Sequence, residues 1–191
     1  IFWGYEADGI FQNQSEVDNH ATQPNAQPGD IRFVDTNGDG VVNADDRTKI
    51  GDPFADFNIG WNLNFKVYDF DLSITTYGTF GNDIFRGFER NLNYTNKPVS
   101  VLSRWTGEGT SNFEPRATFV DSNNNVRPST RYVEDGSYFK IKNVQLGYNF
   151  NVSESKALDG VRIYLQGKNL MTFTDYTGYD PEMSSGVLDT G

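Results

Sequence analysis

The chain has 191 residues, enough for one domain or two small ones, and its 26 acidic and 16 basic side chains give a formal charge of −10. This balance argues against a nucleic-acid partner, because phosphate binding needs a concentrated basic patch. The absence of cysteine excludes disulfides, thiolate metal sites and a cysteine nucleophile.

The residue types favour an all-β fold. Ten Tyr, fifteen Phe and three Trp suit strands better than helical bundles. No run of roughly 18 apolar residues occurs, which excludes a transmembrane helix, whereas a transmembrane strand needs only about 9–11 residues with every second one apolar. The first residues, Ile1-Phe2-Trp3-Gly4, contain no initiator Met and begin no signal segment, so we interpret the sequence as a piece of a longer protein.

The first distinctive segment runs from Asp18 to Asp30 and is rich in Asn, Gln and Pro. Its chain breakers, Pro24 and the Pro28-Gly29 pair, predict a loop. We expect this loop to contribute nothing to a core.

The strongest chemical motif follows at residues 35–46 and matches the spacing of an EF-hand or dockerin calcium loop. Alternate residues of a tightly curled loop point inward, so short oxygen side chains converge on a hard cation, and a glycine at position six permits the sharp turn. The predicted ligands are Asp35, Asn37 and Asp39 at positions one, three and five, the carbonyl of Val41 at seven, Asn43 at nine and Asp46 at twelve, with Gly40 at six.

A plain acidic turn is the alternative to calcium, since Asp, Asn and Gly are also the commonest turn formers. An EF-hand or dockerin also requires a helix after the loop. Here Gly51-Asp52-Pro53 follows almost at once and leaves room for barely one helical turn. We therefore predict a structural calcium ion in an extracellular segment rather than a calcium sensor.

Two hairpins are predicted from period-two alternation. In residues 59–68, Trp61, Leu63, Phe65 and Val67 alternate with Asn62, Asn64 and Lys66, and residues 70–78 alternate again after a tight turn near Tyr68-Asp69. Residues 138–150 and 161–166 form the second pair. A phase slip near Lys142-Asn143 predicts a β-bulge.

Short turns thus alternate with long polar stretches, of which residues 81–132 are the longest. Outer-membrane barrels have this asymmetry, whereas soluble domains rarely contain structureless loops beyond about 12–15 residues. A soluble β-sandwich with decorated loops remains the alternative, because both folds need one apolar face per strand.

Few residues in the sequence suggest a catalytic site. His20, the single histidine, lies in the Asn/Gln/Pro-rich loop, where a surface role is favoured over a triad. No pair of carboxylates stands out for glycoside cleavage. The aromatic residues Trp3, Tyr5, Trp105 and Tyr176 are expected to be exposed, and they suit sugar stacking and girdle or loop packing equally.

Many segments, in order along nearly the whole chain, resemble the C-terminal region of the SusC/RagA family of TonB-dependent outer-membrane transporters. Among them are Asp8-Gly9-Ile10-Phe11-Gln12, Pro28-Gly29-Asp30-Ile31-Arg32-Phe33 before the acidic loop, Arg104-Trp105-Thr106-Gly107-Glu108-Gly109, Val133-Glu134-Asp135-Gly136-Ser137-Tyr138 and Tyr176-Thr177-Gly178-Tyr179-Asp180-Pro181-Glu182.

The resemblance implies that residues 1–191 are a C-terminal fragment of a transmembrane β-barrel of twenty-two strands, in the outer membrane of a Gram-negative bacterium, with long extracellular loops. It implies a SusD-like lipoprotein lid, energy from the TonB complex through a part of the protein outside this chain, contact with outer-membrane lipid, and oligosaccharide or peptide substrates. The chain would supply wall strands and loops that face the substrate and the lid, and it would not be an enzyme. Two alternatives remain: a soluble calcium-stabilised carbohydrate-binding β-module and a secreted glycan-active enzyme.

Overall fold

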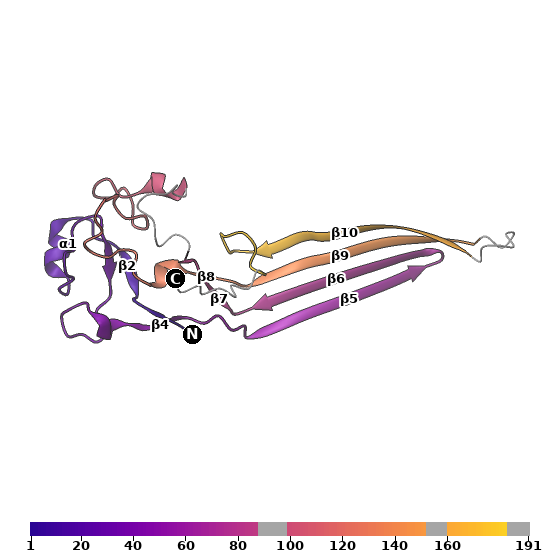
Figure 1. The fold of residues 1–191 in the computed structure, drawn as a ribbon, viewed down its shortest axis with the longest axis horizontal. Helices are drawn as coiled ribbons and strands as arrows, with labels where there is room; N and C mark the ends of the chain where they lie inside the picture. The colour runs from indigo at the N-terminus through magenta and orange to yellow at the C-terminus, as the bar shows by residue number, and fades with distance from the viewer. Residues whose placement is uncertain (88–98, 152–159, 183–191) are drawn as a thin grey trace. The chain divides into compact units, whose positions relative to one another are not determined.

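The computed structural model of the chain describes residues 1–87, 99–151 and 160–182 (Figure 1). The chain divides into two compact units. The first combines residues 1–53 with 84–134, and the second combines residues 54–83 with those from 135 onward. Each unit is therefore assembled from stretches that are distant in the sequence.

The first unit contains only short elements. Its strand pairs are β1 with β4 and β2 with β3, both antiparallel. A further pair, β7 with β8, occurs where the sequence passes between the units. The elements are β1 (Phe2–Gly4), β2 (Ala7–Ile10), α1 (Gln14–Asn19), β3 (Ile31–Phe33), η1 (Ala44–Asp46), β4 (Thr48–Gly51), β7 (Asp83–Phe85), η3 (Val99–Ser103), η4 (Thr130–Tyr132) and β8 (Val133–Asp135), where η denotes a 3-10 helix.

The prediction for residues 18–30 is wrong in two respects. Helix α1, whose N-cap Asn13 accepts a hydrogen bond from the Glu16 N–H, extends to Asn19. Gln23 and Asp30 are buried, so this segment does contribute to the core. The segment contributes polar side chains to the core, and the periodicity of hydrophobic residues does not detect such a contribution.

The side-chain amide of Gln23 pairs with the backbone of β3, as a neighbouring strand would. Its Nε2 donates to the Ile31 carbonyl at 2.7 Å, and its Oε1 accepts from the Phe33 N–H at 2.9 Å. Ile31 and Phe33 pack with Tyr5 and Val42 in the apolar core. The amide thus forms hydrogen bonds with backbone groups on the edge of β3 that have no strand beside them.

The second unit is one antiparallel sheet of four long strands, in the order β10-β9-β6-β5 (Figure 1). Both predicted hairpins are confirmed, and their strands are longer than predicted. The turn between β5 and β6 consists of two residues, and its first, Tyr68, has φ +53°. The strands are β5 (Phe57–Val67), β6 (Phe70–Phe80), β9 (Tyr138–Phe150) and β10 (Val161–Thr174).

The predicted β-bulge is confirmed at Lys142. Thr75 pairs with Asn143 and Thr76 with Ile141, which leaves Lys142 as an extra residue in β9. The insertion offsets the phase slip in the sequence. Apolar side chains on either side of the bulge therefore stay on one face of the sheet.

Connections within the hairpins are short, whereas residues 81–137 separate β6 from β9. The predicted all-β class with antiparallel strands is confirmed, and α1 is the only α-helix in the described parts of the chain. No helix among the described residues combines the length and the apolar composition needed to cross a membrane.

Candidate functional site

The acidic loop, residues 35–46, joins β3 to β4 and folds around its own backbone. The Asp35 carboxylate accepts hydrogen bonds from the N–H groups of Gly38 at 2.7 Å and Gly40 at 2.8 Å. Both glycines have positive φ, +76° and +85°, and open space surrounds the place where a Cβ would stand. Backbone conformation therefore favours glycine at these positions.

The next side chains repeat one hydrogen-bond pattern. Asn37 Oδ1 accepts from the Asp39 N–H, Asp39 Oδ1 from the Val41 N–H, and Asn43 Oδ1 from the Asp45 N–H, at 2.7–2.8 Å. Each side chain bonds the N–H two residues ahead, which is how Asp and Asn stabilise tight turns. The hydrogen bonds fix the side-chain oxygens along the loop.

Asp46 closes the loop. Its carboxylate is fully buried and accepts from the Thr36 N–H at 2.8 Å and from the Asn43 N–H at 2.7 Å. Burial acts to raise the pKa of Asp46, but hydrogen bonds from the backbone of Asn43, Thr36 and Asn37, aided by the Asp35 side chain, outweigh burial and lower the pKa. Asp46 is therefore held ionised while it joins the two ends of the loop.

The loop offers the hard oxygens that calcium prefers, from the predicted carboxylates, the two Asn amides and the Val41 carbonyl. Each carboxylate has about four lone-pair sites, so the hydrogen bonds to the loop backbone leave capacity for a cation. Within the described residues, no group of three or more His, Cys, Asp or Glu is gathered for a metal ion. A calcium shell would thus depend on amide and carbonyl oxygens as well, and calcium stays a prediction.

The chain after the loop follows its prediction. The 3-10 helix η1 ends at Asp46, and strand β4 begins at Thr48. No EF-hand helix follows the loop, so the loop has no second helix to move in a calcium switch.

His20 packs against its neighbours in the first unit. Its ring meets the ring of Phe11 edge-on, with centroids 5.2 Å apart, and its Nδ1 lies 2.9 Å from the Ala21 carbonyl oxygen. The described side chains make no Ser-His-Asp arrangement around it.

The four aromatic candidates for sugar stacking differ in exposure. Trp3 is exposed, whereas Trp105 is half-buried and donates from Nε1 to Gln12 Oε1 at 3.2 Å. Tyr176 is also half-buried. The expectation that Tyr5 is exposed is wrong: the ring packs in the core, which assigns Tyr5 to loop packing.

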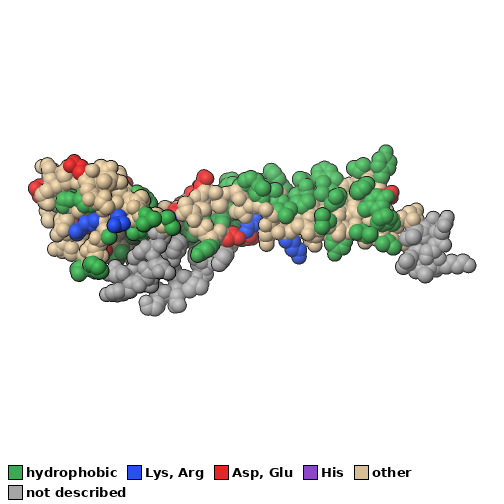
Figure 2. Space-filling model, turned by 90° about the horizontal axis from the view of Figure 1, so that it is seen from above, with side chains coloured by type: hydrophobic (Ala, Val, Ile, Leu, Met, Phe, Trp, Pro, Cys, Tyr) green, Lys and Arg blue, Asp and Glu red, His purple; other side chains and the backbone are tan. Residues whose placement is uncertain are grey.

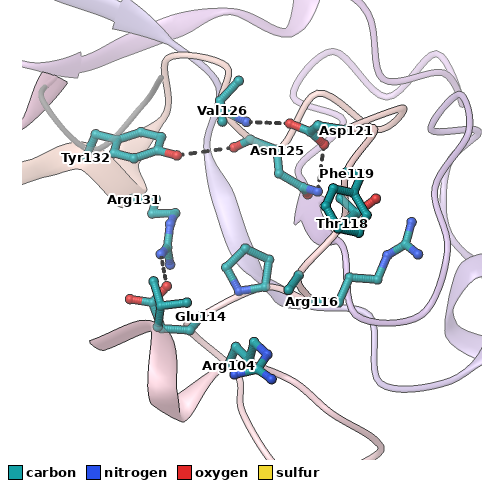
Figure 3. Close-up of a pocket in the computed structure, with 13 residues that line it drawn as sticks. Arg104, Glu114, Arg116, Thr118, Phe119, Asp121, Asn125, Val126, Arg131 and Tyr132 are labelled. Atoms are coloured by element: carbon teal, nitrogen blue, oxygen red, sulfur yellow. Dashed lines mark hydrogen bonds and ion pairs between the residues drawn. The ribbon is translucent and has the colours of Figure 1, made fainter. Parts of the chain in front are cut away.

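A cavity of about 350 Å³ in the first unit is shown in Figure 3. Arg131 pairs with Glu114 at 2.7 Å, and Arg116 pairs with the buried Asp30 at 2.8 Å. Asp121 accepts hydrogen bonds from two neighbours (Figure 3). Because these carboxylates hold the fold together, they do not form the free pair that glycoside cleavage requires.

A second cavity of the first unit, about 370 Å³, is lined by Arg47 and Arg127. Both guanidinium groups lie near the Tyr5 ring, at 5.6 and 4.9 Å from its centroid. Sequence reasoning missed this pair. Residues eighty positions apart leave no local signal of proximity.

One face of the four-stranded sheet is apolar from β5 to β10. Residues directly opposed in the register share a face. On the outer strands β5 and β10 the exposed fraction of the apolar side chains in these rows runs from 44% at Leu63 to 78% at Leu165, whereas most of those on β6 and β9 are half-buried. Figure 2 shows apolar side chains over much of the strand region. The rows of opposed residues are Val67, Phe70, Tyr148 and Ile163; Phe65, Leu72, Leu146 and Leu165; Leu63, Ile74, Val144 and Gly167; and Trp61, Thr76, Ile141 and Met171.

The opposite face is polar. Gln166 Nε2 donates to Asn143 Oδ1 at 2.6 Å, and Arg162 pairs with Asp71. The predicted separation of Trp61, Leu63, Phe65 and Val67 from Asn62, Asn64 and Lys66 is confirmed by this register. The polar rows are Lys66, Asp71, Gly147 and Tyr164; Asn64, Ser73, Gln145 and Gln166; and Asn62, Thr75, Asn143 and Lys168.

No family model matches the chain, but curated sequences do. The TonB-dependent receptor P3 of Formosa agariphila is 35% identical over 193 residues, covering 95% of this chain and 18% of that receptor. The TonB-dependent receptor SusC of Bacteroides thetaiotaomicron is 26% identical, covering 96% of this chain and 18% of SusC. The chain belongs to the TonB-dependent receptors. It spans about a fifth of the length of these two receptors.

The fold agrees with this membership. A structure of the RagAB peptide importer in its closed-closed state aligns with a TM-score of 0.69 and 23% identity, over 94% of this chain and 20% of that one. At this identity the likeness shows a shared fold. The predicted resemblance to the SusC/RagA type is confirmed by the sequence similarity to SusC, and the shared fold agrees with it.

Proposed function

We propose that the chain is the C-terminal part of an outer-membrane transporter, supplying four wall strands and outer loops to a twenty-two-stranded barrel. The observation that carries this proposal is the apolar face of the sheet. Monomeric soluble proteins rarely expose contiguous apolar patches beyond a few hundred Å². In a bilayer, the same side chains are solvated by lipid.

The dimensions of the sheet agree with a membrane span. The strands have 11 to 14 residues, and a tilted transmembrane strand needs about 9–11. On β10 the apolar positions run from Val161 to Phe173, which is ~40 Å at ~3.3 Å per residue. At a tilt of ~35–45° this corresponds to ~28–32 Å along the membrane normal, close to the ~30 Å hydrocarbon core.

The two outer strands need neighbours. In the described sheet, β5 and β10 each have a partner on one side only. Unpaired backbone N–H and C=O groups cost several kcal/mol each in hydrocarbon, so membrane-spanning sheets close on themselves. We therefore assign the missing partners to other strands of the full receptor.

The polar face and the unequal connections give the sheet an orientation. Asn, Gln, Ser, Lys and Arg side chains suit a water-filled lumen. Barrels of this kind have short periplasmic turns and longer extracellular loops. Residues 68–69 and the strand ends at Phe150 and Val161 then lie on the periplasmic side, and the first unit, including the acidic loop, lies outside the cell.

Transport partners are proposed on the strength of family membership. The transporter would import oligosaccharides or peptides together with a SusD-like lipoprotein, and the TonB complex would act through a part of the receptor outside this chain. The description of the related RagAB structure as a peptide importer supports a peptide substrate, and similarity to SusC supports the SusC-type assembly. The chain itself would have no enzymatic role.

Calcium would order the acidic loop. The oxygens of Asp35, Asn37, Asp39, Asn43 and Asp46 and the Val41 carbonyl would hold the ion. A bound ion adds stability without chemistry of its own. In the loop, Asp46 already joins the ends, so the ion would reinforce an existing conformation.

A soluble carbohydrate-binding module is the second candidate. That fold packs two sheets face to face and buries the apolar side of each. The described chain contains one four-stranded sheet and three two-stranded pairs, and most apolar side chains on β5 and β10 of the large sheet remain exposed. The exposed face therefore favours the transporter.

Nitroxide spin labels on the full-length receptor in lipid bilayers test the proposal. Cysteines for labelling are placed one at a time at Leu63 and Leu165, and at their neighbours Asn64 and Gln166 as matched controls. We expect high collision rates with oxygen and low rates with a water-soluble nickel chelate at the two leucines, and the reverse at the controls. Equal accessibility within each pair would contradict the lipid-facing assignment.

A further inference from the structure

The first unit contains two arginines that differ from most others in the described chain. Arginine in this acidic protein usually pairs with a carboxylate. Arg47 and Arg127 have no carboxylate within ion-pair distance among the described residues. The paired arginines are Arg32, Arg86, Arg116, Arg131 and Arg162.

The two unpaired arginines border the same cavity of about 370 Å³, a size suited to a small ligand. The Arg127 guanidinium lies over the rings of Phe33, at 4.4 Å from the centroid, and Tyr5, at 4.9 Å. Arg47 lies 5.6 Å from the Tyr5 centroid. Polar side chains complete much of the lining: Asn25, Asn43, Ser122, Asn123 and Asn124.

The positive charges of Arg47 and Arg127 have no paired counter-ion among the described residues. Burial lowers the pKa of Arg127, and the positive charge of Arg47 lowers it further, while Tyr5 and the charge of Asp121 oppose these effects. Asp121 is the acid whose charge acts on Arg127, but its carboxylate accepts hydrogen bonds from Asn125 and from the Val126 N–H. An anion in the cavity would relieve the repulsion between the two arginines.

Arg127 is also held in place for binding. Its Nε donates to the Asn124 carbonyl at 3.1 Å, and its Nη2 donates to the Asn123 carbonyl. These bonds use two of the five N–H groups of a guanidinium. A donor fixed before binding loses less conformational entropy when the ligand arrives. Arg47 is exposed, so its side chain is free to reach the same ligand.

We propose that Arg47 and Arg127 form a binding site for an oxyanion, namely the carboxylate or sulfate group of an acidic sugar or the free ion itself. Guanidinium groups bind such anions through paired, charge-assisted hydrogen bonds. The site would select acidic ligands in a chain whose net charge of −10 otherwise repels them. This inference does not require that the sheet lie in a membrane.

Isothermal titration calorimetry of the full-length receptor tests the site. The probes are glucuronate, glucose 6-sulfate, inorganic sulfate and, as the neutral control, glucose. We expect saturable binding of the acidic sugars and none of glucose. Binding of inorganic sulfate without either acidic sugar would identify the free ion as the ligand and still support the site. The absence of saturable binding by any anion up to about 10 mM, a Kd already weaker than most specific small-ligand sites, would overturn it.

Variants separate a specific site from general charge effects. Arg47→Gln should weaken anion binding at least ~10-fold, because it removes a charge-assisted hydrogen-bond donor, and Arg47→Lys should weaken it less. Arg104→Gln is the matched control, because Arg104 also lines a cavity, the one in Figure 3, and has no carboxylate partner among the described residues. Equal weakening by Arg104→Gln would refute the site. Unchanged melting of Arg47→Gln shows that it remains folded.

Discussion

Leu63→Arg and Asn64→Arg place the same charge on opposite faces of one strand. Leu63 lies in the middle row of the apolar face, directly opposite Ile74. Asn64 lies opposite Ser73 on the polar face. If the apolar face meets lipid and the polar face meets water, the two substitutions must differ greatly in cost although they are adjacent in sequence.

The expected difference follows from the depth of each position in the membrane. Arginine on the lipid face of a barrel costs ~2–4 kcal/mol near the bilayer midplane and ~0–1 kcal/mol near the interfaces. Leu63→Arg should therefore lower the folding equilibrium constant roughly 30- to 700-fold, at ~1.4 kcal/mol per tenfold. Phe57→Arg, at the end of the strand, should cost much less. Asn64→Arg should change stability by less than ~0.5 kcal/mol, as most solvated substitutions do.

Equilibrium unfolding by guanidinium of the full-length receptor in lipid vesicles measures these differences. The order of stability should be Asn64→Arg, then Phe57→Arg, then Leu63→Arg as the least stable. Similar losses for Leu63→Arg and Phe57→Arg would indicate a face buried against protein, since only a bilayer produces a gradient with depth. Near-neutral effects for all three variants would indicate a face exposed to water. Either result would contradict the assignment of the apolar face to lipid.

Three further predictions concern the first unit. Calcium at a hundredfold over its Kd should stabilise the unit that unfolds with the acidic loop by ~2.7 kcal/mol, and Asp39→Ala should abolish most of this gain; identical melting of the wild type in calcium and in chelator would show an acidic turn only. Because the pKa of Asp46 is lowered by folding, the ionised form stabilises the fold above the unfolded pKa of about 3.9, and this contribution is lost as pH falls through the lower folded pKa. In chelator, Asp46→Asn should therefore flatten the acid limb of the stability curve, and an unchanged acid limb would contradict this. Gln23→Leu should destabilise by ~1–3 kcal/mol, because it leaves the buried Phe33 N–H unpaired and the Ile31 carbonyl with only the 3.2 Å bond from Asn123; a melting point equal to that of the wild type would contradict the pairing of Gln23 with β3.

The sheet could be predicted from sequence because its alternation and its turn depend on residues that are close in the sequence. Alternation in residues 59–67 determines which side chains share a face, and a two-residue turn fixes the register of the hairpin. The slip at Lys142 could be located because a bulge inserts one residue into the alternation. Lengths were less predictable: β10 continues to Thr174, past the point where its alternation is interrupted near Asn169.

The first unit was not predictable in the same way. Its strands have three or four residues, too few to show a period. Gln23 bonds to Asn123 and Asp30 bonds to Arg116, partners 100 and 86 positions along the chain, and the polar character of Gln23 and Asp30 suggested a solvated loop. Tyr5 looked like an exposed ring because the arginines that lie beside it, Arg47 and Arg127, are distant in sequence.

The acidic loop could be predicted from sequence in part. Its spacing predicted a tight curl, and the bonds from Gly38 and Gly40 to Asp35 agree with that geometry. The same hydrogen bonds would stabilise an acidic turn without an ion. The sequence therefore predicts the shape of the loop better than its ligand.

The placement of the sheet in the receptor is tested most directly by electron cryo-microscopy of the full-length protein in lipid nanodiscs. We expect β5 and β10 to be hydrogen-bonded on both sides and the row of Leu63, Ile74 and Val144 to face the lipid belt at mid-depth. A second protein layer over this apolar row, or an open edge on β5 or β10, would contradict the assignment of these strands to a barrel wall.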